Sequence, residues 1–181
     1  MRIHLVIAAC MPLVAIGAPA DKAPVAPGAT VACDVTLNVT DPDPKGLNVR
    51  AAPSTQGKIV AVLKPDGEWT SVHVTGQQGE WLSIDHAETI DDNAKDGSRT
   101  VLDKPGWVHI SKLGISELFT GSGTVLREKP AADGKALLRI KDEDSVPTPL
   151  LACSGKYIKV RHGKVEGWTN TWCNNERTTC S

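Results

Sequence analysis

The sequence predicts an all-β protein built from two tandem small β-barrels. Three observations support this fold class: short apolar segments alternate with turn residues, no helical period of useful length occurs, and landmarks of the first half recur in the second. With 181 residues, 40% of them hydrophobic, and a formal net charge of -1, the chain has the composition of a globular protein. The balanced charge excludes nucleic-acid binding driven by a general basic surplus.

The N-terminal segment has the pattern of a secretory signal peptide. Arg2 and His4 precede an apolar run from Leu5 to Ile16, and the run ends in small residues at positions 18–20. About a dozen apolar residues are too few for a transmembrane helix, which needs roughly 20. We therefore expect residues 1–20 to be a signal peptide, the mature chain to lack a membrane span, and the protein to be exported to the periplasm or the extracellular space. Residues 21–33 are rich in Pro and Ala without a period, which predicts a flexible lead segment.

The cysteines of the mature chain favour disulfide bonds. Export exposes thiols to an oxidising compartment, and the spacings contain none of the close Cys-x-x-Cys pairs of a metal site. The four are Cys33, Cys153, Cys173 and Cys180. They allow three connectivities, and the sequence does not choose among them; Cys173 with Cys180, which bracket a short polar tail, is one open pairing. Because three of the four lie in the second half, we expect reduction to destabilise that half more.

Four landmarks occur in the same order in both halves and indicate an internal duplication. They are a Gly-aliphatic-Arg-Pro segment at 46–53 and 123–130, a Gly-Lys pair at 57–58 and 134–135, an aromatic-led strand at 81–84 and 157–160, and a Gly-Trp pair at 106–107 and 167–168. We place the first unit at residues 34–115, with an insertion at about 85–105, and the second at 116–181, with a Cys-bounded C-terminal tail.

Alternation along the predicted strands separates aliphatic from aromatic side chains. The aliphatic set, expected to fill the interiors, is Leu82, Ile84, Val108, Ile110, Ile158 and Val160. The aromatic set, expected to lie outside or under loops, is Trp81, Trp107, Tyr157 and Trp168. These four rings are candidates for ligand contact, since aromatic faces stack well and dominate interface energetics. The alternative is that they cover the gap between the units or the seams where loops cross.

Three segments resemble the bacterial SH3-like (SH3b) domain: Gly-Leu-Asn-Val-Arg-Ala-Ala-Pro-Ser at 46–54, the Trp-led strand at 81–84, and Gly-Trp-Val-His-Ile-Ser-Lys-Leu at 106–113. The second half is similar to the same domain more loosely, and together the resemblance covers about residues 34–173. It implies two SH3-like barrels and a non-catalytic binding module of the cell envelope that recognises peptidoglycan through stem peptide or glycan. Beside two such units no catalytic domain fits, so we expect a chain that is not an enzyme.

A second hypothesis comes from the insertion, which holds six acidic residues against three basic ones. An acidic surface loop of this length could engage a basic partner. The chain would then be a protein-interaction or immunity protein that inhibits an envelope-targeting hydrolase or binds another periplasmic protein. The partner is thus expected to be peptidoglycan or an envelope protein. The segment 91–97 lacks the ligand spacing of a calcium loop, and we expect neither a metal nor a cofactor.

Several polar residues have two interpretations each. Arg50 and Arg127 recur at matching positions and would suit bidentate carboxylate recognition, but an Arg in a tight loop more often bonds nearby backbone carbonyls, which is the interpretation we favour. Asn48 is expected to be a turn residue that satisfies backbone groups. His73 and His109 are expected to face solvent in structural roles, since no nucleophile motif accompanies them.

Overall fold

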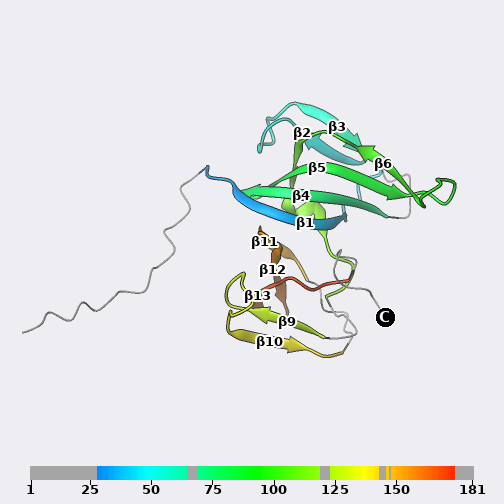
Figure 1. The fold of residues 1–181 in the computed structure, drawn as a ribbon. Coiled ribbons are helices and arrows are strands. Elements are labelled where there is room, and N and C mark those ends of the chain that lie inside the picture. Colours follow the sequence, from blue (N-terminus) through cyan, green and yellow to red (C-terminus); the bar gives the residue numbers. More distant parts are fainter. Residues whose placement is uncertain (1–27, 65–68, 119–122, 143–145, 147, 174–181) are drawn as a thin grey trace, which may run out of the picture.

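In the computed structural model, the described residues are 28–64, 69–118, 123–142, 146 and 148–173. They form two antiparallel sheets and contain no α-helix, only the single 3-10 turn η1 (Ile110–Lys112). The all-β prediction is therefore confirmed. Figure 1 shows the two sheets stacked one above the other, with the first half of the chain in the upper one. The predicted signal peptide, most of the lead segment and Cys180 lie outside the described residues.

The first unit is an eight-stranded sheet. Its strands are β1 (Val31–Val39), β2 (Leu47–Arg50), β3 (Ile59–Leu63), β4 (Thr70–Gln78), β5 (Trp81–Ile90), β6 (Ser98–Leu102), β7 (Gly106–His109) and β8 (Leu113–Gly114). They are ordered β3-β2-β7-β5-β4-β1-β8, and β6 pairs with β5 off this path. Since β3 also contacts β6, the sheet curls back on itself.

The second unit is a five-stranded sheet that repeats part of the first. Its strands are β9 (Thr124–Arg127), β10 (Ala136–Ile140), β11 (Leu150–Ser154), β12 (Tyr157–His162) and β13 (Val165–Thr169). Their order, β10-β9-β13-β12-β11, reproduces β3-β2-β7-β5-β4 strand for strand. The same topology at matched positions supports the internal duplication.

The repeat extends to the backbone of the turn that opens each unit's first matched strand. Gly46 and Gly123 both have positive φ, 93° and 79°, a region that favours glycine. A Cβ atom at Gly46 would collide with the carbonyl oxygen of Leu63, and one at Gly123 would lie 3.0 Å from that of Ile140. The recurring glycine is therefore required by the close approach of the neighbouring strand.

The predicted alternation holds in both units. All six aliphatic side chains assigned to the interior are buried, and Leu82, Ile84, Val108, Ile158 and Val160 have no exposed surface at all. The four aromatic side chains lie on the opposite faces and are half-buried. The buried residues of both units form one continuous apolar cluster, so the core crosses the junction between the sheets.

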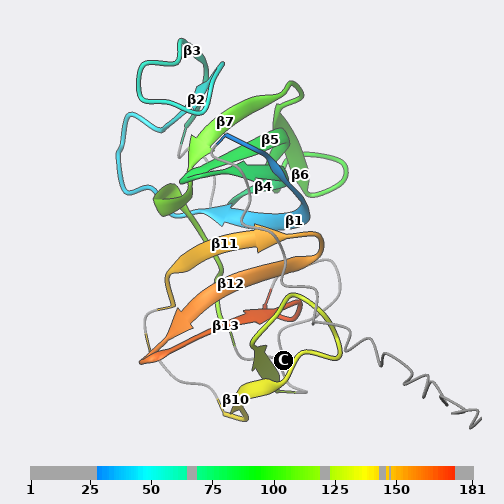
Figure 2. The same ribbon diagram turned by 90° about the vertical axis from the view of Figure 1, so that its left-hand side faces the viewer.

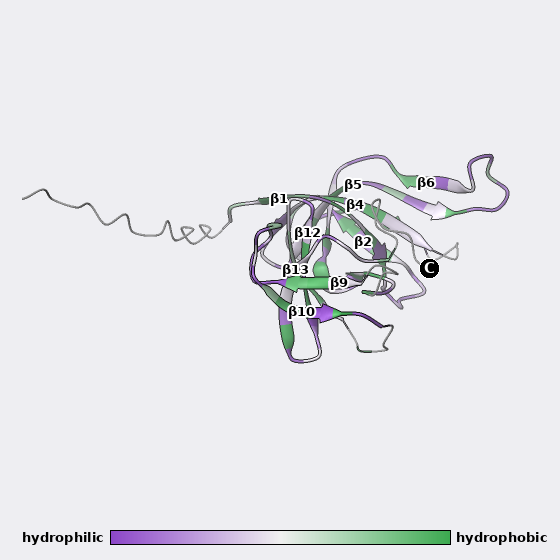
Figure 3. Ribbon diagram, turned by 60° about the horizontal axis from the view of Figure 1, so that its bottom comes forward, coloured by the Kyte–Doolittle hydropathy of each residue, from purple (hydrophilic) through white to green (hydrophobic). Residues whose placement is uncertain are grey.

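Two features of the first unit differ from the sequence analysis. Val31, Ala32 and Cys33, assigned there to the flexible lead segment, form the beginning of β1, where Val31 pairs with Gln77 of β4. The insertion is also not a structureless loop. Its first part continues β5 to Ile90, and its second part forms β6, so the two strands make one long hairpin. Figure 3 shows this hairpin extending beyond the rest of the ribbon.

Candidate functional site

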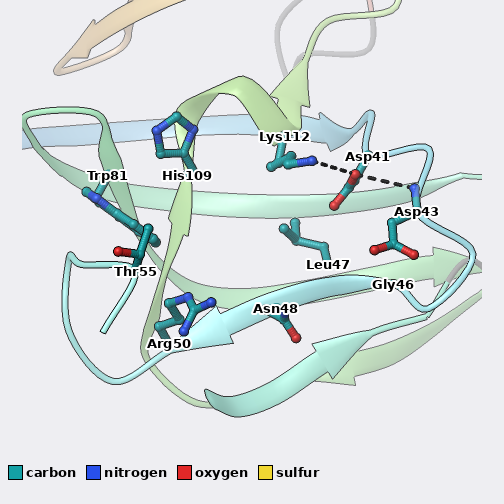
Figure 4. A pocket seen from close by; sticks show the side chains of 10 residues that line it. All are labelled: Asp41, Asp43, Gly46, Leu47, Asn48, Arg50, Thr55, Trp81, His109 and Lys112. Carbon is teal, nitrogen blue, oxygen red and sulfur yellow. Dashed lines mark hydrogen bonds and ion pairs between the residues drawn. The ribbon is translucent and has the colours of Figure 1, made fainter. Parts of the chain in front are cut away.

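A solvent-open pocket of about 280 Å³ lies on the first unit, where several segments meet. The stretch between β1 and β2 supplies one side, β2 and the turn after it supply the floor, and the ends of β5, β7 and η1 supply the other side (Figure 4). The lining residues are Asp41, Asp43, Gly46, Leu47, Asn48, Arg50, Thr55, Trp81, His109 and Lys112.

An ion pair closes one end of the pocket. Lys112 Nζ donates to Asp41 Oδ1 at 2.8 Å, across 71 residues of sequence. The Asp41 side chain is only 7% exposed, whereas that of Lys112 is 40% exposed. The turn that follows is shaped by Asp43, whose Oδ1 accepts from the backbone N–H of Lys45 at 2.9 Å and whose carbonyl accepts from Gly46 N–H. A buried carboxylate in contact with a half-exposed ammonium places both charges at this end.

Trp81 and His109 form the aromatic end. They are cross-strand partners on β5 and β7, and their rings meet edge to face with centroids 5.4 Å apart and planes at 88°. His109 Nδ1 is 2.8 Å from the hydroxyl of Ser111, and its Nε2 lies 3.7 Å from a Glu80 carboxylate oxygen. These contacts fix the orientation of the His109 ring, and the half-buried indole of Trp81 faces the pocket beside it.

The floor contains two residues whose roles were considered from the sequence, Arg50 and Asn48. Arg50 donates from Nη1 to the carbonyl oxygen of Gly57 at 2.8 Å, which confirms the expected bond to a nearby backbone carbonyl. A guanidinium has further N–H donors, so this bond does not use all of its capacity. Asn48 was expected in a turn, and that expectation is wrong: it lies within β2, with its side chain exposed on the pocket floor.

Of the six candidate binding residues, Arg50 and Trp81 line this pocket. Trp107 pairs with Arg50 and Ser83 across neighbouring strands but does not line the pocket. Trp168 and Arg127 pair with each other in the second unit. Arg127 Nη1 donates to Gly134 at 2.9 Å, the counterpart of the Arg50 bond. Tyr157 opens β12 as Trp81 opens β5.

The second unit offers an internal comparison for the pocket. A spacing of 77 residues relates the first two matched strands, and a spacing of 61 relates the Gly-Trp pairs and the turn after them. Backbone hydrogen bonds agree with this alignment: Thr40 N–H bonds Lys112 O, and Cys173 N–H bonds Glu117 O. At the positions of Asp41, His109 and Lys112 the second unit has Leu118, Asn170 and Cys173. The fold therefore does not itself require the charged groups of the pocket.

Sequence reasoning missed most of the polar lining, above all Asp41, Asp43, His109 as a pocket residue, and Lys112. The signal that could have found them is the contrast between the repeats. Positions that keep the same residue type, such as the matched glycines and arginines, maintain the turns. Positions where a charged residue of the first unit is replaced by an apolar residue in the second are not needed to maintain the turns.

The described part of the chain contains no group of three or more Cys, His, Asp or Glu side chains placed to hold a metal ion. In segment 91–97, Asp91 is paired with Arg99 at 3.4 Å and accepts from the backbone N–H of Asn93. None of the described helical segments is long and apolar enough to cross a membrane.

Residues 45–113 match the family model of the bacterial SH3 domain. No curated protein and no solved structure matches the chain. The match spans β2 to β7 with η1 and includes eight of the ten pocket residues, all except Asp41 and Asp43. The first unit thus contains one bacterial SH3 domain, a non-catalytic family whose members are typically cell-wall-binding modules.

Proposed function

We propose that this protein is an exported, non-catalytic cell-envelope binding module that recognises peptidoglycan through the pocket of its first unit. The observation that carries the proposal is the difference between the two repeats. They share strand order, turn glycines and the Arg–carbonyl bonds. In the first unit, however, the Asp41–Lys112 ion pair and the Trp81–His109 pair border an open pocket, and the second unit has Leu118, Asn170 and Cys173 at the positions of Asp41, His109 and Lys112.

The lining suits a peptide or glycan with charges of both signs. Trp81 offers a flat apolar face for a sugar ring or a peptide bond. Lys112 and the remaining N–H groups of Arg50 can donate to a carboxylate, and Asp43 can accept from an ammonium group. Stem peptides of peptidoglycan carry both kinds of group. Because these side chains are partly exposed, we expect the contribution of charge to binding to fall with salt.

The compartment is supported by the covalent structure. Cys33 and Cys153 form a disulfide bond, and such bonds persist in oxidising compartments. The bond and the bacterial SH3 domain are consistent with an extracytoplasmic protein. We propose that residues 1–20 direct this export. The second unit, by its strand order, is proposed to be a second SH3-like domain.

The test is co-sedimentation of the oxidised protein with purified peptidoglycan sacculi. Trp81→Ala removes the aromatic wall of the pocket, and Tyr157→Ala makes the matched change in the second unit. We expect saturable binding by the wild type, at least about a tenfold weaker affinity for Trp81→Ala, in the range of an aromatic anchor, and little change for Tyr157→Ala. Trp107→Ala and Trp168→Ala test the two other aromatic candidates. Circular dichroism of each variant controls for folding.

If the wild type fails to bind sacculi at low salt, the peptidoglycan proposal is overturned. If binding occurs but Tyr157→Ala weakens it as much as Trp81→Ala does, binding exists but the assignment to this pocket is wrong.

A protein-interaction role is the second candidate, and the β5–β6 hairpin favours it. The hairpin carries the acidic insertion, and beside its turn Trp69 and Ile90 are 48% and 42% exposed. These two residues are joined by a backbone hydrogen bond from Ile90 N–H to Trp69 O. Deleting the whole insertion would remove the buried residues Ala87, Thr89 and Leu102 and unfold the unit. Replacing only the turn 91–97 with Asn-Gly keeps the hairpin, and loss of a stoichiometric envelope partner in that variant would support this role.

A further inference from the structure

The two units are joined by a compact set of contacts at one end of β1. The disulfide between Cys33 and Cys153 links β1 to β11. Beside it, Asp34 N–H donates to the carbonyl of Gly155 at 2.9 Å, and Gly155 N–H donates to the carbonyl of Ala32 at 2.8 Å. Figure 2 shows β1 lying directly against β11 at this junction. The turn between β11 and β12 therefore docks on β1 together with β11.

The Asp34 side chain extends this junction into a chain of charged groups. Its Oδ2 lies 3.2 Å from Nζ of Lys156, which belongs to the docking turn. Its Oδ1 lies 3.2 Å from Nε2 of His73 on β4. The other ring nitrogen of His73, Nδ1, lies 2.8 Å from Oδ1 of Asp85 on β5. The His73 ring thus lies between the carboxylates of Asp34 and Asp85, and the Asp34 carboxylate also contacts the second unit.

This geometry selects a protonation state of His73. Ionised carboxylates only accept hydrogen bonds, and a neutral imidazole has a single N–H donor. Both bonds of His73 can therefore be made at once only by the imidazolium, which donates from both nitrogens. When the proton leaves, one of the two carboxylates faces a lone pair and loses its partner.

We propose that His73 is a proton-dependent fastener of the two units, which as the imidazolium holds Asp34 in place to receive Lys156 and the docking turn. The groups that face it come from every neighbouring element. Asp34 is on β1, Asp85, His86 and Glu88 are on β5, and Lys156 is on the β11–β12 turn; Thr36 and Ser71 add neutral hydroxyls to the same pocket. Two adjacent carboxylates outnumber the one nearby ammonium, which favours the charged ring.

The pKa directions agree with this arrangement. Burial acts to lower the pKa of His73, but the hydrogen bonds and charges of Asp85 and Asp34 outweigh it and raise the pKa above 6.5. The pKa of Asp34 is lowered below 3.8, first by its hydrogen bond to His73 and then by that to Lys156. A raised histidine pKa gives stabilisation that is complete below the unfolded value and lost as pH rises through the folded value. A lowered aspartate pKa gives stabilisation that is lost in acid. The fastener is thus closed between the two folded-state pKa values.

The test uses the Cys33–Cys153 disulfide as a reporter of how firmly β1 is docked on β11. Full-length wild type and His73→Gln are equilibrated in glutathione buffers at about pH 5.5 and about pH 9, on either side of the histidine titration. Each is approached from the oxidised and the reduced side. The thiols are then trapped, and the oxidised fraction of this pair is measured by mass spectrometry. At each pH, the equilibrium constant for forming the disulfide in the wild type is divided by that in the variant. Thiol ionisation is common to both proteins and therefore cancels in this ratio.

We expect this ratio to be about two- to fivefold higher at the lower pH, the range measured for partly exposed ion pairs. His86→Gln is the matched control, because His86 is the cross-strand neighbour of His73 and lines the same pocket, and its ratio should not change with pH. A His73→Gln ratio that is the same at both pH values overturns the proposal.

A measurement on the wild type removes any dependence on the folding of a variant. The pKa of His73 is read by NMR from its ring-proton shifts in the oxidised wild type and, for comparison, in Asp85→Asn. We expect a wild-type pKa above 6.5 and a lower pKa in Asp85→Asn. A wild-type value at or below 6.5 shows that Asp34 and Asp85 do not stabilise the imidazolium and equally overturns the proposal.

Discussion

Arg50 and Arg127 hold the same position in the two units: each donates from Nη1 to the backbone carbonyl of the glycine seven residues later, Gly57 at 2.8 Å and Gly134 at 2.9 Å. The bond spans the turn after the first matched strand, and the same backbone bonds recur within both turns, such as Gly57 N–H to Ser54 O and Gly134 N–H to Ala131 O. Because both arginines make this bond, comparing the same substitution at the two positions separates the structural role of the bond from any role in binding.

We predict that Arg50→Met and Arg127→Met each lower the free energy of unfolding by about 1 kcal/mol, the usual value of one hydrogen bond. Urea denaturation measures this loss. Only Arg50 lines the pocket, so only Arg50→Met should also weaken binding to sacculi. If both variants bind sacculi equally well, Arg50 serves only to stabilise the turn.

The Asp41–Lys112 pair makes a prediction about buried charge. Lys112→Met leaves the 7% exposed Asp41 carboxylate without its ammonium partner, and we expect a loss of about 1 to 3 kcal/mol in the free energy of unfolding. Lys129→Met is the matched control, since its partner Asp133 is 76% exposed and an exposed pair is worth less than about 1 kcal/mol. Thermal or urea unfolding compares the two, and a similar small loss in both would show that Asp41 is hydrated.

The disulfide between the units changes the expectation for reduction. From the positions of the cysteines in the sequence, reduction is expected to destabilise the second unit more, but the Cys33–Cys153 bond joins β1 to β11. Replacing both cysteines with Ser should cost about 2 to 4 kcal/mol. Because the junction is common to both units, amide exchange should increase at buried positions of each, for example at Leu82 and at Ile158. Increased exchange confined to Ile158 would agree with the earlier expectation instead.

A carboxylate of the second unit should titrate abnormally in acid. Arg161 first, and then Lys159, lower the pKa of Glu166 below 4.5 through hydrogen bonds of 2.8 to 3.0 Å. The stabilisation is therefore present above the unfolded pKa and is lost as pH falls through the folded one. NMR titration should find a Glu166 pKa that rises in Arg161→Met and, by a smaller amount, in Lys159→Met. An unchanged value in Arg161→Met would show that this pair does not persist in solution.

The strands and their faces could be predicted from the sequence because both depend on local pattern. Alternation placed Ile84 and Val108 inside and Trp81 outside, and the spacing of the glycines and arginines revealed the repeat. These features need only neighbours along one strand or one turn. The bacterial SH3 domain at 45–113 follows from the same short segments.

The pocket and the junction could not be predicted in this way, because both depend on how distant segments are brought together. Asp41 meets Lys112 only after β7 and η1 return to the end of β1. The choice of Cys153 as the partner of Cys33 depends on the docking of two units. Cys173 is also disulfide-bonded, but Cys180, its candidate partner, lies outside the described residues. Asn48 was misplaced because its residue type favours turns, whereas pairing with Val62 keeps it in β2.

The bond between Cys33 and Cys153 also sets an order of events in the making of the protein. Its two cysteines are 120 residues apart, so a chain synthesised from its N-terminus presents Cys33 long before its partner exists. Until the β11–β12 hairpin has formed, the first strand carries an unprotected thiol, open to capture by any other cysteine. Correct disulfide formation therefore depends on the folding of the second unit, which supplies the partner of Cys33. Truncation or slow folding of the C-terminal half would then appear as misoxidation of Cys33, near the opposite end of the chain.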